Sequence, residues 1–375
     1  MASKTKEVVT TTTKVAADGS KTVTTTTTTT ETKTTVSDGK SWFGGLSPLF
    51  KALFIIGALL IVGVIVGVLF FGRAKVSSNT MEPNYAKGST VWFKRFGAPE
   101  RGDVLVFRHP EADSIIHNAP DKNYYKMTRL YGDAWCNKNI DPVEFQGKKK
   151  RPIFLSRCIG LPGDVIAIRD NKLSINNNPV EEVENTKSLF LTVTDDILKN
   201  EYLEPLGIKK SDITYSGEDA ETIISFYHNA IPTNSQAALY SLSETEADAI
   251  YKNNIARKLV RVSMPKDYFE RTVFPYIEKL HWNSSNFGPI QIPAKDKVLK
   301  LTTKILPFYR RCIEVYEGNK VEVKGNDIFI NGEKTESYTF RRNYFFVLGD
   351  NRSTEDDSRY FGFLPDNHVM GVACE

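Results

Sequence analysis

The stretch RPIFLSRCIGLPGDVIAIRDNKLSINN, residues 151–177, predicts a mainly β fold. In it, short runs of β-branched and other large apolar residues alternate with Pro, Gly, Asp and Asn, which is typical of strands joined by tight turns. Similar runs occur in STVWFKRF, GDVLVFRHP, NDIFINGE and YFFVLGD. We therefore expect most of the chain after residue 73 to form a β framework.

Two segments of this framework resemble each other in sequence. VIAIRDNKLSINNNPVEE (165–182) and VEVKGNDIFINGEKTES (321–337) each read as a strand, an Asx/Gly turn, a second strand and an Asn-centred turn. They predict two similar hairpins. The segment between them is more helical, and Ser243 and Glu246 in it match a helix capping box. We interpret the segment as an inserted α+β subdomain.

Residues 52–71, ALFIIGALLIVGVIVGVLFF, predict a transmembrane helix. The run carries no charge, and twenty helical residues span about 30 Å, the thickness of the hydrocarbon core of a bilayer. A cleavable signal peptide is the rival interpretation, but its apolar region is shorter and lies nearer the N-terminus. We therefore expect the helix to remain as an anchor. Basic residues flank both ends, so charge alone does not decide its orientation.

The N-terminal tail is dominated by threonine and offers few apolar side chains to bury, which predicts disorder. The pieces KVAADGSK and TTVSDGK leave open an alternative of short hairpins around Asp-Gly turns that order on a partner. The expected order of the chain is a tail at 1–47, a transmembrane helix at 48–73, a first β part at 74–182, an insertion at 183–318 and a second β part at 319–375.

Composition argues against several classes of function. The formal net charge is +4 over 375 residues and no basic cluster is interleaved with aromatic residues, so we expect no nucleic-acid partner. The cysteines lack CxxC spacing and the five histidines lack ligand spacing, so no metal or cofactor is expected. The sequence leaves the pairing of these cysteines open: Cys136, Cys158, Cys312 and Cys374.

Four stretches in the same order resemble the type I signal peptidase family, whose members cut signal peptides from exported proteins with a Ser/Lys dyad. They are SSNTMEP (77–83), RGDVLVF (101–107), SRCIGLPGDVI (156–166) and GDNRSTEDDSRYFGFLP (349–365). The insertion and NFGPIQIP (286–293) are similar to those of Bacteroidota members. The resemblance implies a signal-peptidase-like antiparallel β framework anchored in the inner membrane. It also implies a cytoplasmic N-terminus and a periplasmic main domain.

The positions that define proton transfer in the family are altered in this sequence. Thr80 stands at the position of the nucleophilic serine, and Ser156 at that of the general-base lysine. Glu355 replaces the serine that supports this lysine. Thr80 keeps a hydroxyl, but the hydroxyl of Ser156 has no useful basicity near neutral pH. Lys126 carries another amine, and nothing in the sequence places it beside Thr80.

Other site residues match the family pattern. Ser78 corresponds to the side-chain oxyanion donor, and the backbone N–H of Thr80 would supply the second donor. Four further charged residues are expected to form a salt-bridge and hydrogen-bond network that supports the site: Asp350, Arg352, Asp357 and Arg359.

Three interpretations follow for function. The first is a catalytically inactive, signal-peptidase-like membrane protein of the export pathway. Such a protein would be a binding or accessory subunit for signal peptides, preproteins, a translocon component or another membrane protein, and its cleft would bind peptides by strand addition. The second is an active peptidase that removes signal peptides, with Thr80 as nucleophile and Glu355 as base. The third is an ordinary active enzyme whose motifs are misaligned.

Overall fold

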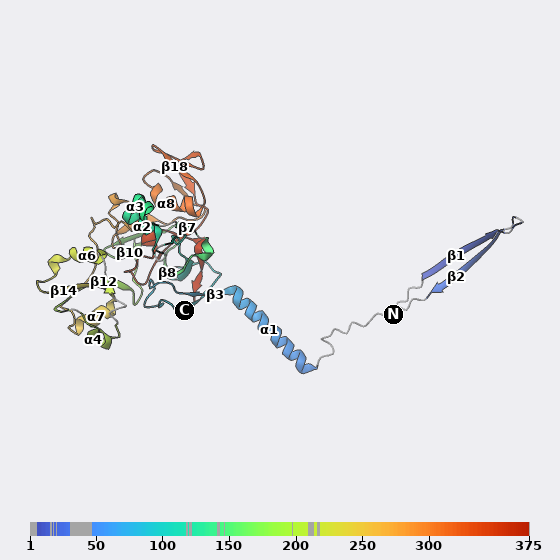
Figure 1. The fold of residues 1–375 in the computed structure, drawn as a ribbon, viewed down its shortest axis with the longest axis horizontal. Helices are drawn as coiled ribbons and strands as arrows, with labels where there is room; N and C mark the ends of the chain where they lie inside the picture. Colours follow the sequence, from blue (N-terminus) through green and yellow to red (C-terminus); the bar gives the residue numbers. More distant parts are fainter. Residues whose placement is uncertain are drawn as a thin grey trace. The chain divides into compact units, whose positions relative to one another are not determined.

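The fold is taken from a computed structural model, which describes residues 6–15, 17, 19, 21–30, 47–117, 119, 122–140, 143–145, 147–196, 198–208, 214–215 and 218–374. The chain divides into two compact units, Met1–Val66 and Gly67–Glu375. The first unit contains a β hairpin and most of a long helix, and the second contains the β framework (Figure 1).

The hairpin consists of β1 (Lys6–Val15) and β2 (Lys21–Thr30), paired antiparallel with Thr10 opposite Thr26. Over these residues the structure differs from the predicted disordered tail and takes the alternative of a hairpin. Threonine is β-branched and favours strands, and Gly19 adopts a φ of +84° in the turn. The predictions for residues 1–5 and 31–46 lie outside the described residues.

Helix α1 (Pro48–Phe70) contains most of the apolar run. Its most apolar 18-residue window has a mean hydropathy of 3.1, and the helix is long and apolar enough to cross a membrane. None of its residues is buried against protein. Strand β3 begins at Phe71, directly after the helix ends.

The main sheet has seven antiparallel strands within the described residues, in the order β23-β22-β8-β5-β24-β4-β3. The strands are β3 (Phe71–Lys75), β4 (Thr90–Lys94), β5 (Val104–Arg108), β8 (Ile153–Gly160), β22 (Tyr344–Leu348), β23 (Leu364–Pro365) and β24 (Val369–Ala373). Apolar side chains cover both faces of its centre, because β5 and β22 are almost entirely buried. The sheet thus joins segments from both sides of the insertion.

The two predicted hairpins are confirmed as antiparallel meanders. The first is β9 (Val165–Arg169), β10 (Lys172–Ile175) and β11 (Asn178–Pro179), and the second is β18 (Val321–Lys324), β19 (Asp327–Ile330) and β20 (Glu333–Thr335). Asp170 and Asn171 both have positive φ in the first turn, as a two-residue hairpin turn requires. Strand β16 (Phe287–Gln291) pairs with β9 and completes a four-stranded sheet.

The insertion carries its own sheet, in the order β13-β14-β12-β15. Its strands are β12 (Lys187–Thr194), β13 (Thr214–Tyr215), β14 (Gln236–Ser243) and β15 (Lys258–Arg261), and its helices include α4 (Asn200–Leu203), α6 (Glu218–Ser225) and α7 (Glu244–Lys252). The predicted capping box is confirmed at the start of α7, where Ser243 and Glu246 bond reciprocally. Figure 1 shows these elements gathered together, apart from the β18 meander.

The remaining elements surround the framework. They are β6 (Ser114–Ile116), β7 (Val143–Phe145), β17 (Val298–Lys300), β21 (Ser337–Thr339), α2 (Tyr124–Tyr131), α3 (Asp133–Asn139), α8 (Leu306–Arg311), α9 (Ser358–Phe361), the π-helix η6 (Cys312–Tyr316) and the 3-10 helices η2 (Lys148–Lys150), η3 (Glu204–Leu206), η4 (His228–Ala230), η5 (Glu278–Leu280) and η7 (Asp366–His368).

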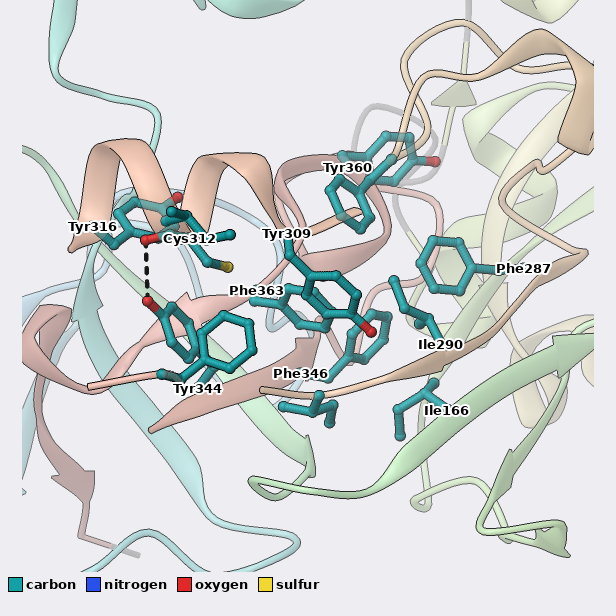
Figure 2. Packing of buried hydrophobic residues seen from close by; sticks show 14 of the residues in the cluster. Ile166, Phe287, Ile290, Tyr309, Cys312, Tyr316, Tyr344, Phe346, Tyr360 and Phe363 are labelled. Carbon is teal, nitrogen blue, oxygen red and sulfur yellow. Dashed lines mark hydrogen bonds between the residues drawn. The ribbon is translucent and has the colours of Figure 1, made fainter. Parts of the chain in front are cut away.

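The largest apolar cluster lies between the main sheet, the β9 sheet and α8. Figure 2 shows how its aromatic rings meet, with Tyr309 of α8 stacked on Phe363 at 5.8 Å between ring centroids. The Tyr344 hydroxyl donates to the carbonyl oxygen of Cys312, which lies in η6. This core holds β22 in place, and the site loop begins where β22 ends.

Candidate active site

The candidate nucleophile lies in a turn after β3. The Oγ of Ser78 is 2.7 Å from the Oγ1 of Thr80, so the two hydroxyls share a hydrogen bond. The backbone N–H of Thr80 also points to the Oγ of Ser78, at 3.5 Å. Met81, which is only 1% exposed, packs with Val76 and Leu155 and anchors the turn to the sheet. The structure therefore brings together the proposed nucleophile and both proposed oxyanion donors.

Thr80 is completely enclosed, with 0% of its surface exposed. Gly349 lies against it so closely that a Cβ at this position would be 2.5 Å from the Cγ2 of Thr80 and 2.6 Å from its carbonyl oxygen. The glycine after β22 thus makes room for the threonine methyl group. A peptide carbonyl has no open path to the hydroxyl in this arrangement.

Asn351 connects the site loop to the nucleophile turn. Its backbone N–H donates to the carbonyl oxygen of Thr80 at 2.8 Å, and its side-chain amide reaches the carbonyl oxygen of Asn79 at 3.4 Å. The Oδ1 of Asn351 accepts from Ser241 of β14 at 2.9 Å and from Ser353 at 2.6 Å. Asn351, Thr80 and Ser241 are buried and Ser353 is partly buried, so the bonds among them are shielded from water, whereas Asn79 is exposed.

The insertion also pairs with the site loop through its backbone. The N–H of Lys187 donates to the carbonyl oxygen of Asp350, and the N–H of Arg352 donates to the carbonyl oxygen of Lys187, both at 2.8 Å. These bonds form an isolated parallel bridge between Lys187 and Asn351. The side chain of Lys187 turns to Glu246 of α7, at 3.5 Å.

Ser156 does not meet Thr80. It lies on β8 with no exposed surface, and its hydroxyl donates to the carbonyl oxygen of Leu155 at 2.7 Å. Among the described residues, no hydrogen bond joins Ser156 to the nucleophile turn. The general-base position therefore presents no amine and no acceptor to Thr80.

Glu355 forms an ion pair with Lys126 of α2, with 2.5 Å between Oε2 and Nζ. Both side chains line a hollow of about 540 Å³ that Asn79 also borders. No feature of the sequence predicts that Lys126 lies near the site. The ammonium group of Lys126 therefore pairs with the carboxylate that the peptidase interpretation assigned as the general base.

The next residue, Asp356, also lines this hollow, and the pKa of its carboxyl group is raised. Burial raises the pKa of Asp356 to about 6, and the neighbouring Glu355 and Asp357 add to the effect. An aspartate ordinarily titrates near 4, so this group gives up its proton about two pH units later than in the unfolded chain.

Three of the four predicted supporting residues lie in two separate ion pairs, and the fourth partner is Arg157. Arg157 binds Asp350 through two bonds of 2.8 and 2.6 Å, and Asn84 of the nucleophile turn binds the same carboxylate at 2.8 Å. Arg359 binds Asp357 at 2.8 Å. These buried bidentate contacts fix the ends of the site loop.

Arg352 takes a different position from the one we predicted. Its carbonyl oxygen accepts from Arg359 at 2.8 Å, but its guanidinium forms no ion pair with any described carboxylate. Its Nε is fully buried and has no hydrogen-bond partner among the described residues. We predicted one network of four side chains. The structure instead has two separate ion pairs, and the guanidinium of Arg352 belongs to neither.

One edge of β8 beside the site is open. The backbone groups of Cys158 and Pro152 form hydrogen bonds on the side of β8 that faces β5. Because backbone groups point to alternate sides along a strand, those of Ile153 and Leu155 face the opposite side. On that side β22 pairs with β8 only as far as Arg157. Among the described residues, this edge at Ile153 and Leu155 therefore has no strand partner. Leu155 packs with Met81, which places the open edge next to the nucleophile turn.

The four cysteines are free thiols. Burial raises the pKa of the Cys158 thiol to about 12 and that of Cys312 well above its usual value. Among the described residues, no group of three His, Cys, Asp or Glu could hold a metal ion.

Sequence reasoning missed Ser241 and Lys187, because nothing local distinguishes a serine or lysine that will meet a loop more than a hundred positions later. Asn351 and Arg157 stand inside the family-like stretches but received no role. Their positions directly beside Asp350 and Ser156 were the available signal.

An antiparallel sheet with a buried hydroxyl pair, directly after a long apolar helix, defines a signal-peptidase type of protein. The chain belongs to the signal peptidase family: the family described as "Signal peptidase, peptidase S26" matches residues 49–204 and 335–374, more than half of the sequence. It is thus a type I signal-peptidase-like protein of protein export. The substrates of this family are preproteins that carry signal peptides.

Curated relatives agree with this assignment. The signal peptidase I of Buchnera aphidicola subsp. Schizaphis graminum is 21% identical over 363 residues, which cover 92% of this chain and 77% of that relative. Its counterpart from Buchnera aphidicola subsp. Baizongia pistaciae is 23% identical and covers 84% of this chain and 71% of the relative.

Among solved structures, a signal peptidase I from Enterococcus faecalis V583 matches 74% of this chain and 97% of its own, at 16% identity and a TM-score of 0.23.

Proposed function

We propose that this chain is a catalytically inactive member of the family that binds signal peptides of exported preproteins at the membrane. The observation that carries the proposal is the absence of a base at Thr80: Ser156 bonds to the Leu155 carbonyl and Glu355 to Lys126, as far as the described residues extend. A positioned general base contributes roughly 10²- to 10⁴-fold to such reactions, and more where nucleophile and base act together.

The enclosure of Thr80 supports the same conclusion. Its methyl group fills the space against Gly349, and the hydroxyl is bonded to Ser78. Attack on a carbonyl requires an approach to about 3 Å along an open path. The threonine therefore acts as a packing residue that preserves the shape of the turn.

Peptide binding needs neither base nor nucleophile. The unpaired edge of β8 at Ile153 and Leu155 offers main-chain donors and acceptors to an extended segment. Strand addition of this kind gives affinity through the backbone and leaves selectivity to neighbouring side-chain pockets. The apolar helix α1 would anchor the chain in the membrane, where the apolar part of a signal peptide resides.

The orientation in the membrane is part of the proposal. α1 is a single anchor of the inner membrane, with the N-terminus cytoplasmic and the β framework periplasmic. Cysteine labelling from each side of the membrane in spheroplasts tests it. A framework protected from the outside would contradict this orientation.

The boundaries of the insertion also remain a proposal, and the strand pairing supports a narrower one than 183–318. The separate sheet runs from Lys187 to Arg261, whereas β16 pairs with β9 of the framework. We therefore place the end of the added subdomain before Phe287. A translocon component or another membrane protein would bind on this added part.

Cleavage of a preprotein by purified, detergent-solubilised protein tests the proposal. We expect no cleavage by the natural sequence, and cleavage by a Thr80→Ser/Ser156→Lys/Glu355→Ser variant, because it restores the nucleophile, the amine and its supporting hydroxyl. The matched control carries Thr80→Ala in place of Thr80→Ser and should be inactive. Binding of the uncut preprotein is measured in the same samples.

The second candidate function is a threonine peptidase with Glu355 as base. It predicts that Thr80→Ala and Glu355→Ala each abolish a measurable cleavage by the natural sequence. The Lys126 ion pair argues against it, because the carboxylate must first leave its partner. Cleavage that depends on both residues would reverse our proposal.

A further inference from the structure

A cavity of about 710 Å³ lies between the framework and the inserted sheet. Ile159 of β8 and Leu173 of β10 line it from the framework, and Leu189 of β12 and Ile223 of α6 line it from the insertion. Its volume falls within the range of about 300–1,000 Å³ typical of ligand sites. Most of its walls are apolar, so an apolar ligand body would be well accommodated.

Arg352 of the site loop stands out among the charged groups in this cavity. Five other arginines line the wall. Four of them pair with a carboxylate, Arg101 with Asp164, Arg157 with Asp350, Arg261 with Glu182 and Arg359 with Asp357, and the fifth, Arg271, is exposed. Arg352 has no such partner among the described residues, and its Nε is buried without a hydrogen bond.

Among the described residues no carboxylate forms an ion pair with Arg352, and Asp357, Glu182 and Asp350 act on its charge only at longer range. Glu355 is paired with Lys126, and Glu182 with Arg261. Glu270 accepts from the backbone N–H of Ser284, and burial raises the pKa of Glu270, which favours its neutral form. The wall therefore carries one partly buried guanidinium, that of Arg352, which forms no ion pair among the described residues. The other wall charges without an ion pair are exposed to solvent: Glu181, Glu278 and Arg271.

Such an arrangement is costly in the empty protein and favours an anionic ligand. A buried charge is tolerated when it is paired and hydrogen-bonded. The planar guanidinium matches the geometry of a carboxylate in particular, through two parallel bonds. The hydroxyl of Ser353, in the same wall, is a further polar group beside this position.

We propose that this cavity binds the free C-terminal carboxylate of an apolar peptide, with Arg352 as its anchor and the inserted sheet as its apolar wall. Cleavage of a preprotein by a separate, active peptidase leaves a peptide of this chemistry, an apolar segment with a new carboxylate. The cavity would hold this product, whereas the edge of β8 binds the uncut chain. Only the source of the peptide rests on the proposed function.

Fluorescence anisotropy with the full-length protein tests the assignment. The probes are a labelled apolar hexapeptide with a free carboxylate, and the same hexapeptide as its C-terminal amide. Hydrogen bonds to charged groups correspond to roughly 10- to 100-fold in affinity. We therefore expect the acid to bind about that much more tightly than the amide, and Arg352→Gln to make the two equal.

Arg310→Gln is the matched control, because Arg310 of α8 is an exposed arginine that pairs with Glu314 of η6 and lies outside the cavity. It should leave the preference for the acid unchanged. Ile223→Trp fills the cavity from the insertion without touching the site loop, and should weaken binding of both probes. If Arg352→Gln does not fold, loss of binding in Ile223→Trp still tests whether the peptide binds in this cavity.

Equal binding of acid and amide by the natural sequence would overturn the proposal, as would an acid preference that persists in Arg352→Gln. Decanoate is included as a second source of an apolar carboxylate. If it binds through Arg352 while the peptide does not, the ligand is a fatty acid and the peptide assignment is wrong. Binding of an uncut preprotein is read separately, so the failure of either proposal is recognised independently.

Discussion

The backbone N–H of Asn351 lies 2.8 Å from the carbonyl oxygen of Thr80, and the side chain of the same asparagine accepts a 2.9 Å bond from Ser241. One residue thus joins the nucleophile turn to the inserted sheet. The parallel bridge between Lys187 and Asn351 reinforces this junction. The insertion is therefore part of the structure that shapes the site.

Ser241→Ala should loosen the nucleophile turn. It removes a buried hydroxyl that bonds to Asn351 and Ser353, at a cost of about 1–2 kcal/mol. Hydrogen exchange followed by mass spectrometry should show faster exchange in peptides covering 77–83 and 349–354. Ser263→Ala is the control, because the Ser263 hydroxyl is buried without a partner among the described residues. If hydrogen exchange in these peptides is unchanged in Ser241→Ala, the insertion does not stabilise the nucleophile turn.

Gly349→Ala should destabilise the fold by about 2–3 kcal/mol, the range of overpacked buried positions. The new methyl group would meet the Thr80 side chain and the Thr80 carbonyl oxygen. Thr80→Ser relieves only the first contact, so the double variant should recover part of the loss at most. Urea unfolding measures the change in the free energy of unfolding. Gly147→Ala is the control and should leave stability nearly unchanged, because a Cβ at Gly147 would meet no atom within 4 Å.

Asp356→Asn should stabilise the protein at neutral pH and not near pH 4. The folded-state pKa of about 6 lies above the unfolded value of 3.8, so the folded state holds its proton more tightly between these values. Stability from this group is present at low pH and is lost as pH rises through 6. The loss amounts to about 2–3 kcal/mol. Urea unfolding of both proteins at pH 4 and pH 7.5 checks the sign.

An advantage of Asp356→Asn at pH 7.5 that persists undiminished at pH 4 would contradict this titration. The comparison with the natural sequence is needed because His109 and His368 act in the opposite direction. Burial lowers the pKa of each to about 4, so their contribution to stability is lost as pH falls toward that value.

The Lys126–Glu355 pair should show a modest coupling energy. A double-mutant cycle with Lys126→Met and Glu355→Gln should give about 0.5–1 kcal/mol, because the lysine side chain is partly exposed and solvent screens the pair. The exposed pair Lys252–Asp248 is the matched control and should couple less. Zero coupling would leave Glu355 available as a base and would favour the peptidase alternative.

Much of the fold could be predicted from local sequence. Asp170 and Asn171 adopt the positive φ that their hairpin turn requires, and the Ser243–Glu246 capping box forms as expected. These features depend on neighbours within a few residues, so a single sequence reveals them. The resemblance of ordered stretches supplied the family.

The site was predicted less completely, because its contacts depend on tertiary structure. The Ser78–Thr80 contact follows from their spacing in one turn, but Lys126 reaches Glu355 from a helix 229 positions earlier. Arg352 was assigned to a network that the buried pairs of Arg157 and Arg359 form without its side chain. Charge pairing among many arginines and carboxylates cannot be deduced from residue types alone.

Strand β24 lies between β5 and β4 in the middle of the main sheet, with Gly371 opposite Val106. One edge of β5 therefore has no strand partner until β24, more than 250 residues later in the sequence, has been synthesised and has paired with it. Such long-range pairing slows folding, since the entropy of loop closure is lost before the contacts form. During synthesis, the edge of β5 that β24 will fill therefore stays open and apolar after β8 has paired with the other edge, which exposes the nascent framework to aggregation.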